Sequence, residues 1–319
     1  MADPADTLPD TTMGDLGMTD WQPISAESAA GLEQAGLSPA AVAELVAKTL
    51  AEDLDGGVDV TTVATVPEEQ RATLDLVARG SGIVAGAVVA RVVFDLVAGA
   101  AAAIEVTTPD GDPVAPGDRI LRVTGPTRGL LLAERTALNL LCHLSGVATA
   151  TQEWVAAVGD TGAAVRDTRK TTPGMRRLEK YAVRCGGGQN HRMSLSDAAL
   201  VKDNHVLAAG GVAAAFAAVR ERFPGLAVEV EVDSLDQLTE VLAAGADLVL
   251  LDNFTPEQMR QAVRITAGRA RLEASGGLTV TTAAEVAATG VDYIAVGALT
   301  HSSPILDIGA DLTLATGKD

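Results

Sequence analysis

Residues 227–233 read Ala-Val-Glu-Val-Glu-Val-Asp, a short stretch in which valines alternate with carboxylates. Such alternation is typical of a β-strand with one apolar face and one charged face. Packing alone does not explain a charged face with Glu231 near its centre. The pattern fits the interior of a (β/α) barrel, whose active site is built at the carboxyl ends of its strands.

Five further apolar runs lie around this stretch, and polar or glycine residues follow each of them. Alanine-rich helical windows separate the runs, so we predict parallel strands with crossover helices. A dinucleotide-binding sheet would need a glycine fingerprint after its first strand, and the nearest glycine-rich segment, 80–85, lies in the other half of the chain. The runs are 163–166, 198–201, 248–251, 272–274 and 293–296, with helices expected at 212–223, 235–244, 256–267 and 281–289.

The first third of the chain mixes helices and strands without this repeat. Ser38 and Pro39 are typical of a helix start. Residues 71–78 alternate like a strand, and residues 82–99 have the composition of a long apolar helix. Pro126 opens a long amphipathic helix. The first 20 residues contain five aspartates and no lysine or arginine, so we expect a disordered acidic tail over 1–22.

Composition excludes several classes of function. The 319 residues carry a net charge of −18, which disfavours binding to nucleic acids or to anionic membranes. Aromatic residues make up only 3% of the chain, too few for a base-stacking platform. Arg91 and Asp95 interrupt the most apolar stretch, so it is not a membrane span. Two cysteines and an acidic N-terminus suggest a reducing cytoplasm.

A local basic patch runs against this acidic background. Nine of the 24 lysines and arginines lie between 166 and 205, with only four acids. A solvated helix face explains Arg176, Arg177 and Lys180. It does not explain the cations that adjoin strand ends or the glycines at 186–188, so we predict a small polyanionic ligand there. Arginine suits carboxylates, and lysine suits phosphate. The cations in question are Arg169, Lys170, Arg192 and Lys202.

Two glycine loops and two carboxylates complete the candidate site. Ser275-Gly276-Gly277 and Val296-Gly297-Ala298 follow the last two strand runs, where such barrels bind phosphate. Glu231 and Asp252 lie at strand ends between the cations and these loops. Carboxylates in a positive pocket indicate a magnesium site or a developing cation. Ion pairing with Lys170 or Lys202 is the structural alternative, and both roles can coexist.

Other catalytic sets are missing from the sequence. It has no Walker A loop, no HExxH and no CxxC. Of the four histidines, His143 lies on the long helix in a structural setting, and His301 is ambiguous. His191 adjoins Arg192 in the basic segment and is the best candidate for contacting an acid.

Together these segments resemble the quinolinate phosphoribosyltransferase family. The resemblance runs from about residue 45 to 308, with Cys185 and Val58 as visible departures. It implies an α/β fold in which an N-terminal α/β sandwich precedes an open (α/β) barrel of six or seven parallel strands. The boundaries are 1–22 for the tail, 23–135 for the sandwich, 136–298 for the barrel, and 299–319 for a segment that returns to the N-terminal domain. The matching segments are 134–139, 167–174, 186–192, 202–205, 229–233, 251–253 and 275–277.

The resemblance also implies roles for individual residues. Arg135 would reach the quinolinate of a neighbouring subunit, in a homodimer or hexamer with shared active sites. Lys170 would lie between quinolinate and phosphoribosyl pyrophosphate, and Glu231 and Asp252 would meet the ribose and Mg²⁺ through substrate and water. The two glycine loops would hold the 5-phosphate. The quinolinate pocket would be completed by Thr168, Arg169, His191, Arg192 and Lys202.

The implied reaction transfers phosphoribosyl from phosphoribosyl pyrophosphate to quinolinate with loss of CO2, as in de novo NAD biosynthesis. It yields nicotinate mononucleotide and pyrophosphate. Two alternatives stay open at this point. One is a barrel lyase or aldolase that uses Lys170 or Lys202 as a Schiff base. The other is a pyridine-dicarboxylate sensor without turnover, against which the presence of Glu231 and Asp252 argues.

Overall fold

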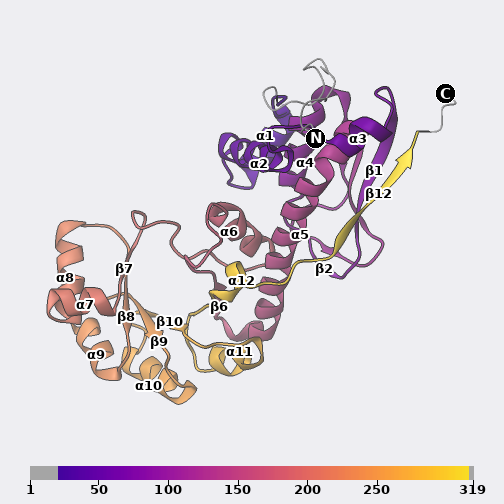
Figure 1. The fold of residues 1–319 in the computed structure, drawn as a ribbon. Helices are drawn as coiled ribbons and strands as arrows, with labels where there is room; N and C mark the ends of the chain where they lie inside the picture. Colours follow the sequence, from indigo (N-terminus) through magenta and orange to yellow (C-terminus); the bar gives the residue numbers. More distant parts are fainter. Residues whose placement is uncertain (1–20, 316–319) are drawn as a thin grey trace, which may run out of the picture.

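A computed structural model describes residues 21–315 of the chain (Figure 1). The predicted acidic tail lies outside the described residues apart from its last two. Of these, Gln22 donates its backbone N–H to the carbonyl of Leu96 at 2.8 Å. In the described part of the chain no helix is long and apolar enough to cross a membrane.

The N-terminal domain is built on a four-stranded antiparallel sheet in the order β12-β1-β5-β3. The alternation in β1 is confirmed: Ala72, Leu74, Leu76 and Ala78 are fully buried, with partly exposed residues between them. The sheet packs against helices α4 and α5. The elements are α1 (Ala26–Gln34), α2 (Pro39–Leu54), α3 (Val60–Thr65), β1 (Arg71–Ala78), α4 (Ala87–Ala98), β3 (Ala103–Val106), β5 (Arg119–Pro126) and β12 (Ile308–Leu314).

The apolar segment 82–99 was expected to be one helix, and this expectation is wrong over its first five residues. Gly82–Ile83 forms β2, which pairs with β4 (Pro113–Val114). Helix α4 begins only at Ala87, after Gly86 at φ 95°. Its end is followed by a short 3-10 turn, Gly99–Ala101. A glycine at positive φ turns the chain at low cost, and apolar composition alone did not reveal that turn.

Helix α5 (Thr127–Val158) connects the two domains. Its 32 residues span about 48 Å at 1.5 Å per residue. It follows Pro126, as the sequence predicts, and contacts α4 in the N-terminal domain and α6 and α11 in the barrel domain. A 3-10 turn, Gly159–Thr161, ends it. Figure 1 shows the helix running from one domain to the other.

The C-terminal domain is a six-stranded parallel sheet in the order β6-β11-β10-β9-β8-β7. The described residues show no pairing between β6 and β7, so the barrel is open there, and the predicted fold class is confirmed. Its strands are β6 (Ala164–Arg166), β7 (Ala199–Val201), β8 (Val228–Val232), β9 (Leu248–Asp252), β10 (Arg271–Ser275) and β11 (Tyr293–Ala295). Its helices are α6 (Arg176–Cys185), α7 (Asp203–Ala209), α8 (Val212–Arg222), α9 (Leu235–Ala243), α10 (Pro256–Thr266), α11 (Val280–Ala287) and α12 (Ala298–His301).

Strand β8 has the two faces that its sequence predicts. Val228, Val230 and Val232 are buried on one face, while Glu229 and Glu231 share the other, because side chains alternate along a strand. The carboxylate face is the barrel interior, since His191 bridges Glu229 of β8 and Glu273 of β10, two strands that are not neighbours.

The C-terminal segment passes along α5 before it enters the N-terminal sheet. Leu306 donates its N–H to the carbonyl of Cys142 at 3.0 Å, and β12 pairs with β1 over seven residue pairs. The close passage requires glycine at position 146. A Cβ there would lie 2.1 Å from the carbonyl oxygen of Pro304 and 2.8 Å from the Cα of Ile305.

We therefore expect Gly146→Ala to destabilise the protein by about 1–3 kcal/mol, the usual cost of forcing extra volume into a packed site. Gly129→Ala on the same helix is the matched control. Its Cβ would only make ordinary contacts, the nearest at 3.6 Å, so its stability should be unchanged or higher by up to ~1 kcal/mol. Chemical denaturation of both variants checks this, and equal stability would contradict the packing argument.

Candidate active site

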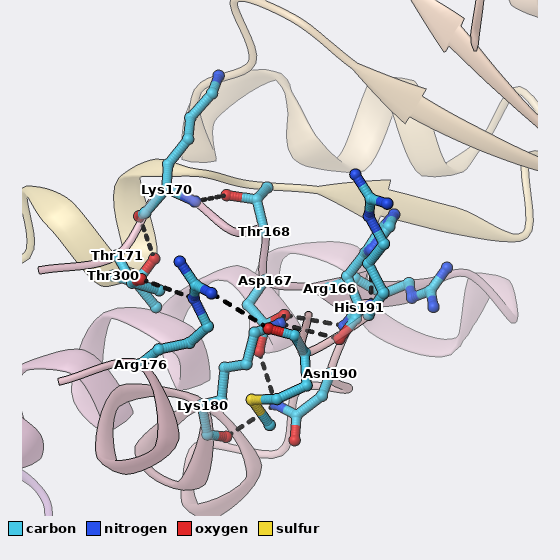
Figure 2. Close-up of polar contacts among 12 residues, drawn as sticks. Arg166, Asp167, Thr168, Lys170, Thr171, Arg176, Lys180, Asn190, His191 and Thr300 are labelled. Carbon is cyan, nitrogen blue, oxygen red and sulfur yellow. Dashed lines mark hydrogen bonds and ion pairs between the residues drawn. The ribbon is translucent and has the colours of Figure 1, made fainter. Parts of the chain in front are cut away.

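The segment after β6 is anchored by Asp167, a fully buried carboxylate that pairs with the fully buried ammonium of Lys180. Asp167 also accepts the backbone N–H of His191 at 2.8 Å and the side-chain amide of Asn190 at 2.6 Å. Burial raises the pKa of Asp167 and lowers that of Lys180, while their mutual attraction opposes both shifts. This anchor, drawn in Figure 2, ties the basic segment to the end of β6.

Lys170 leaves this anchor and points away from it (Figure 2). Its backbone is fixed from two sides: its N–H donates to Thr168 Oγ1 at 3.0 Å, and its carbonyl accepts the Thr300 hydroxyl at 2.7 Å. A Cβ at Gly297 would lie 3.0 Å from Lys170 Cδ and 3.5 Å from Thr168 Oγ1. The structure therefore brings Thr168, Lys170 and the second glycine loop together, as the site prediction requires.

Glu231 and Lys202 form an ion pair at the ends of β8 and β7. Lys202 Nζ lies 2.7 Å from Glu231 Oε2, with the lysine side chain 46% exposed and the glutamate 16% exposed. The structural role considered for Glu231 is therefore present. The pair stands at the rim of the barrel, open to solvent, where a charged ligand can compete for either partner.

Asp252 and the first glycine loop are neighbours. Asp252 pairs with Ser275 in the register of β9 and β10, and Asn253 donates its backbone N–H to the Ser275 carbonyl at 2.9 Å. A Cβ at Gly276 would lie 2.1 Å from Asn253 Oδ1. Glycine at position 276 thus allows the loop after β10 to approach the loop after β9, beside the Asp252 carboxylate. Within the described chain this carboxylate accepts a hydrogen bond only from Asn253.

Two arginines of the basic segment, Arg169 and Arg192, form no ion pair among the described residues, although the charges of Glu229 and Asp197 act on Arg192 from beyond ion-pair distance. Arg169 Nε is buried and has no hydrogen-bond partner. The Arg192 guanidinium donates to the carbonyl of Ala198 at 3.0 Å. Burial, and after it the charge of Arg169, lowers the pKa of Arg192. Two guanidiniums that repel each other at a partly buried position provide a receptor for an anion.

A buried charged cluster below the rim was missed as a site by the sequence reasoning. His191 Nε2 lies 2.6 Å from Glu229 Oε2 and 3.6 Å from Glu273 Oε1, and Arg166 Nη1 lies 2.6 Å from Glu273 Oε2. Burial, followed by the charge of Glu229, raises the pKa of Glu273 to about 7. The signal that could have found Glu229 was the alternation that puts it on the same face as Glu231.

Arg135 lies on α5, and among the described residues no hydrogen bond or ion pair joins it to the other predicted site residues. Arg135 is exposed on α5. The basic segment packs against the same helix at Ala148, where a Cβ on Gly186 would lie 2.3 Å from the Ala148 carbonyl. Ala148 lies 13 positions after Arg135, about 20 Å along the helix, and His143 lies eight positions after it, about 12 Å. His143, between them, accepts or donates a hydrogen bond with buried Glu179 at 2.9 Å, the structural setting expected for it.

A cavity lined mainly by the N-terminal part of the described chain lies away from the predicted site residues. It has a volume of about 760 Å³ and is lined by residues of α1, α4 and α6, including Glu27, Arg91 and Tyr181. None of the predicted site residues lines it. We therefore base the site on the strand ends, because that is where the cations, carboxylates and glycine loops converge.

Two family models match the chain, one in each domain. Residues 59–145 match the family model described as "Quinolinate phosphoribosyl transferase, N-terminal domain", and residues 147–311 match the corresponding C-terminal domain. The matched regions contain every predicted site residue.

Relatives match over most of their length. The nicotinate-nucleotide pyrophosphorylase [carboxylating] of Mycobacterium leprae is 52% identical over 276 residues, which cover 85% of this chain and 97% of that protein. The probable enzyme of the same name from Bacillus subtilis is 42% identical, with 83% and 91% covered.

Among solved structures, NadC from Streptococcus pyogenes is similar with a TM-score of 0.84 and 42% identity, covering 88% of this chain and 99% of that one. The matches to both domain models, together with a relative 52% identical over most of the chain, show that this protein belongs to the quinolinate phosphoribosyltransferase family.

Proposed function

We propose that the protein is an enzyme that transfers the phosphoribosyl group of phosphoribosyl pyrophosphate to quinolinate with loss of CO2, in NAD biosynthesis. The observation that carries this proposal is the Arg169–Arg192 pair. These two cations lie together at the strand ends, and a buried Nε of Arg169 lacks a partner. A planar dicarboxylate would supply the missing acceptors. The names of the relatives, nicotinate-nucleotide pyrophosphorylase [carboxylating], indicate the reaction.

Quinolinate would bind where the cations meet. Arg169 and Arg192 would hold its carboxylates, with Lys202 at the rim and His191 beneath Arg192. Thr168 and Lys170 lie beside Gly297, and the two loops 275–277 and 296–298 would bind the 5-phosphate through backbone N–H groups. Lys170 would then stand between the two substrates, where its charge neutralises the pyrophosphate as it leaves.

The carboxylates would act on the ribose. As pyrophosphate leaves C1, the ribose becomes positively charged, and Glu231 and Asp252 at neighbouring strand ends are placed to stabilise that charge. The pyridine nitrogen of quinolinate forms the new bond to C1. The resulting pyridinium withdraws electrons from the 2-carboxylate, so CO2 leaves once the site holds the ring in position.

Magnesium fits this donor set. Mg²⁺ usually binds to one or two protein carboxylates, keeps several waters, and takes its other ligands from substrate phosphates. Glu231 and Asp252 are carboxylates at adjacent strand ends, and Asp252 has acceptor capacity beyond its bond to Asn253. When bound with the substrate, the ion would neutralise pyrophosphate charge.

A Schiff-base role for Lys202 is disfavoured by its contact with Glu231 at 2.7 Å. A Schiff base at Lys202 would break this ion pair and leave the Glu231 carboxylate without its partner. A sensor without turnover would have no use for Asp252 and Glu231 at the ribose position. The phosphoribosyl transfer reaction uses all of these groups.

We also propose a homodimer, or a hexamer of such dimers, in the cytoplasm. Arg135 is exposed on α5, which leaves its side chain available to a second copy of the chain. Both cysteines are free, which fits a reducing compartment.

Quinolinate with phosphoribosyl pyrophosphate and Mg²⁺ should release CO2, and nicotinate should be a poor substitute. A hydrogen bond to a charged group contributes roughly 1.5–3 kcal/mol, so loss of the 2-carboxylate should lower kcat/KM by at least about tenfold. Measurement of labelled CO2 and of nucleotide product checks this. Turnover of nicotinate at an equal rate would contradict the dicarboxylate pocket, and no CO2 from quinolinate would overturn the function.

Glu231→Gln should lower kcat by on the order of 10²-fold, the effect of losing one electrostatic stabiliser of a transition state, and change KM much less. Glu285→Gln on exposed α11 is the control and should be silent. If Glu231→Gln retains kcat and loses only thermal stability, Glu231 serves the Lys202 ion pair alone.

Arg135→Ala and Lys202→Ala should each be nearly inactive as pure dimers. If Arg135 serves the neighbouring site, a hybrid of the two carries both lesions in one site and none in the other. Mixed refolding should then restore roughly a quarter of wild-type activity, because half the dimers are hybrids and half of their sites are intact. An inactive mixture with hybrids demonstrated by mass spectrometry would place Arg135 in its own chain's site.

A further inference from the structure

Both ring nitrogens of His191 are engaged by the protein itself. Nδ1 accepts the backbone N–H of Arg192 at 2.7 Å, and Nε2 lies 2.6 Å from Glu229 Oε2. Because a backbone N–H can only donate, Nδ1 carries no proton, so the ring proton lies on Nε2 and is donated to Glu229. The imidazole thus connects a buried carboxylate to the backbone of Arg192.

The carboxylate end of this connection is deeply buried and rigidly built. Glu229 is 3% exposed and Glu273 is fully buried. Arg166 holds Glu273 at 2.6 Å and stacks over the Tyr293 ring at 4.5 Å. The cluster therefore joins strands β6, β8, β10 and β11 around one imidazole.

This cluster lowers the stability of the fold, so folding alone does not explain its presence. Glu229 Oε1 and Glu273 Oε1 are buried without a hydrogen-bond partner, and an unsatisfied buried polar atom lowers stability. An apolar filling would pack this interior layer without that loss. This charged cluster contains acceptor atoms without hydrogen-bond partners and lies next to Arg192 in the proposed site. We take this as an indication that the cluster helps to position Arg192.

We propose that Glu229 is a positioning residue: through His191 it fixes the backbone of Arg192 and so aims the Arg192 guanidinium, together with Arg169, at the dicarboxylate. This inference rests on the proposed function. Among the described residues the Arg192 side chain makes one other hydrogen bond, from Nη1 to the Ala198 carbonyl, so its backbone anchor sets where the guanidinium reaches. Glu229 itself is covered by protein and does not reach the ligand.

The kinetic test compares Glu229→Leu with Glu229→Gln. Leucine removes the acceptor, so KM for quinolinate should rise by about tenfold or more, since displacement of a binding group by about 1 Å can cost on the order of 10²-fold. KM for phosphoribosyl pyrophosphate should stay unchanged. Glutamine keeps an acceptor oxygen for Nε2–H and should restore KM close to the wild-type value.

Asp95→Leu is the matched control. Asp95 is a buried carboxylate of the N-terminal domain that accepts two hydrogen bonds from Ser25. Its loss should lower thermal stability without changing KM for quinolinate. An unchanged quinolinate KM in Glu229→Leu, or a Gln variant as impaired as the Leu variant, overturns the positioning role. Absence of turnover by the wild-type chain instead overturns the proposed function.

Nitrogen NMR of the ligand-free wild-type protein tests the geometry without any variant or substrate. The His191 ring should show protonated Nε2 and unprotonated Nδ1. A proton on Nδ1 overturns the proposal. So does a divalent cation that co-purifies with the wild-type chain in equal amount and is lost from Glu229→Gln, because His191, Glu229 and Glu273 would then be metal ligands, for which their atoms lie close enough.

Discussion

The buried ion pair between Asp167 and Lys180 is the interaction on which the site depends. Both side chains are fully buried, and taking two charges out of water costs several kcal/mol per ion before attraction and hydrogen bonds offset it. Asp167 recovers that cost with bonds to Lys180, His191 and Asn190. Lys180 also donates to the His191 carbonyl at 2.8 Å. Three structural units meet there: the end of β6, helix α6 and residues 190–191, which follow the glycine turn.

The barrel of this protein carries charged side chains in its interior. A typical barrel fills its centre with layers of branched apolar side chains. Here Glu229, Glu231 and Glu273 point inward on β8 and β10. Arg166 pairs with Glu273, and the neutral His191 ring donates a hydrogen bond to Glu229. The upper carboxylate, Glu231, is balanced by Lys202 at the solvent-exposed rim. The deep ion pair of Glu273 with Arg166 is closed to solvent, whereas the rim pair of Glu231 with Lys202 is accessible. A charged substrate can therefore compete for the rim pair without disturbing the deep one.

Sequence reasoning located the strands well because their signal is local. Alternation in β1, the valines of β8 and the polar residues at strand ends are set by side-chain periodicity, which neighbouring residues reveal. The glycine loops and Lys170 could also be found this way, because each follows directly on a strand. The start of α4 could not, since composition made 82–99 uniformly apolar and only the pairing of β2 with β4 separates its first residues.

The interior cluster escaped for a different reason. Glu229, Glu273, Arg166 and His191 are separated by up to 107 positions in the sequence, and nothing local says that they meet. The sequence alternation places Glu229 inside the barrel, but its partner is chosen by the closure of the sheet and by the path of the segment 186–192. Which carboxylate a histidine contacts is a property of the topology and not of either residue's neighbours.

The cations of the site fall into two groups, and the difference bears on the reaction. Lys202 and Arg166 already have carboxylate partners. Arg169 and Arg192 repel each other and form no ion pair among the described residues, and Glu229 and Asp197 act on Arg192 only from beyond ion-pair distance. A dianion bound between Arg169 and Arg192 would relieve the repulsion between these two guanidiniums. The free energy that the repulsion costs the ligand-free fold would then contribute to ligand affinity. Lys202 keeps its contact with Glu231 until a charged ligand competes for the lysine. Occupation of the pocket would then free the Glu231 carboxylate to move. In the site proposed here, dicarboxylate recognition by Arg169 and Arg192 would be coupled to ribose activation by Glu231 through the same barrel rim.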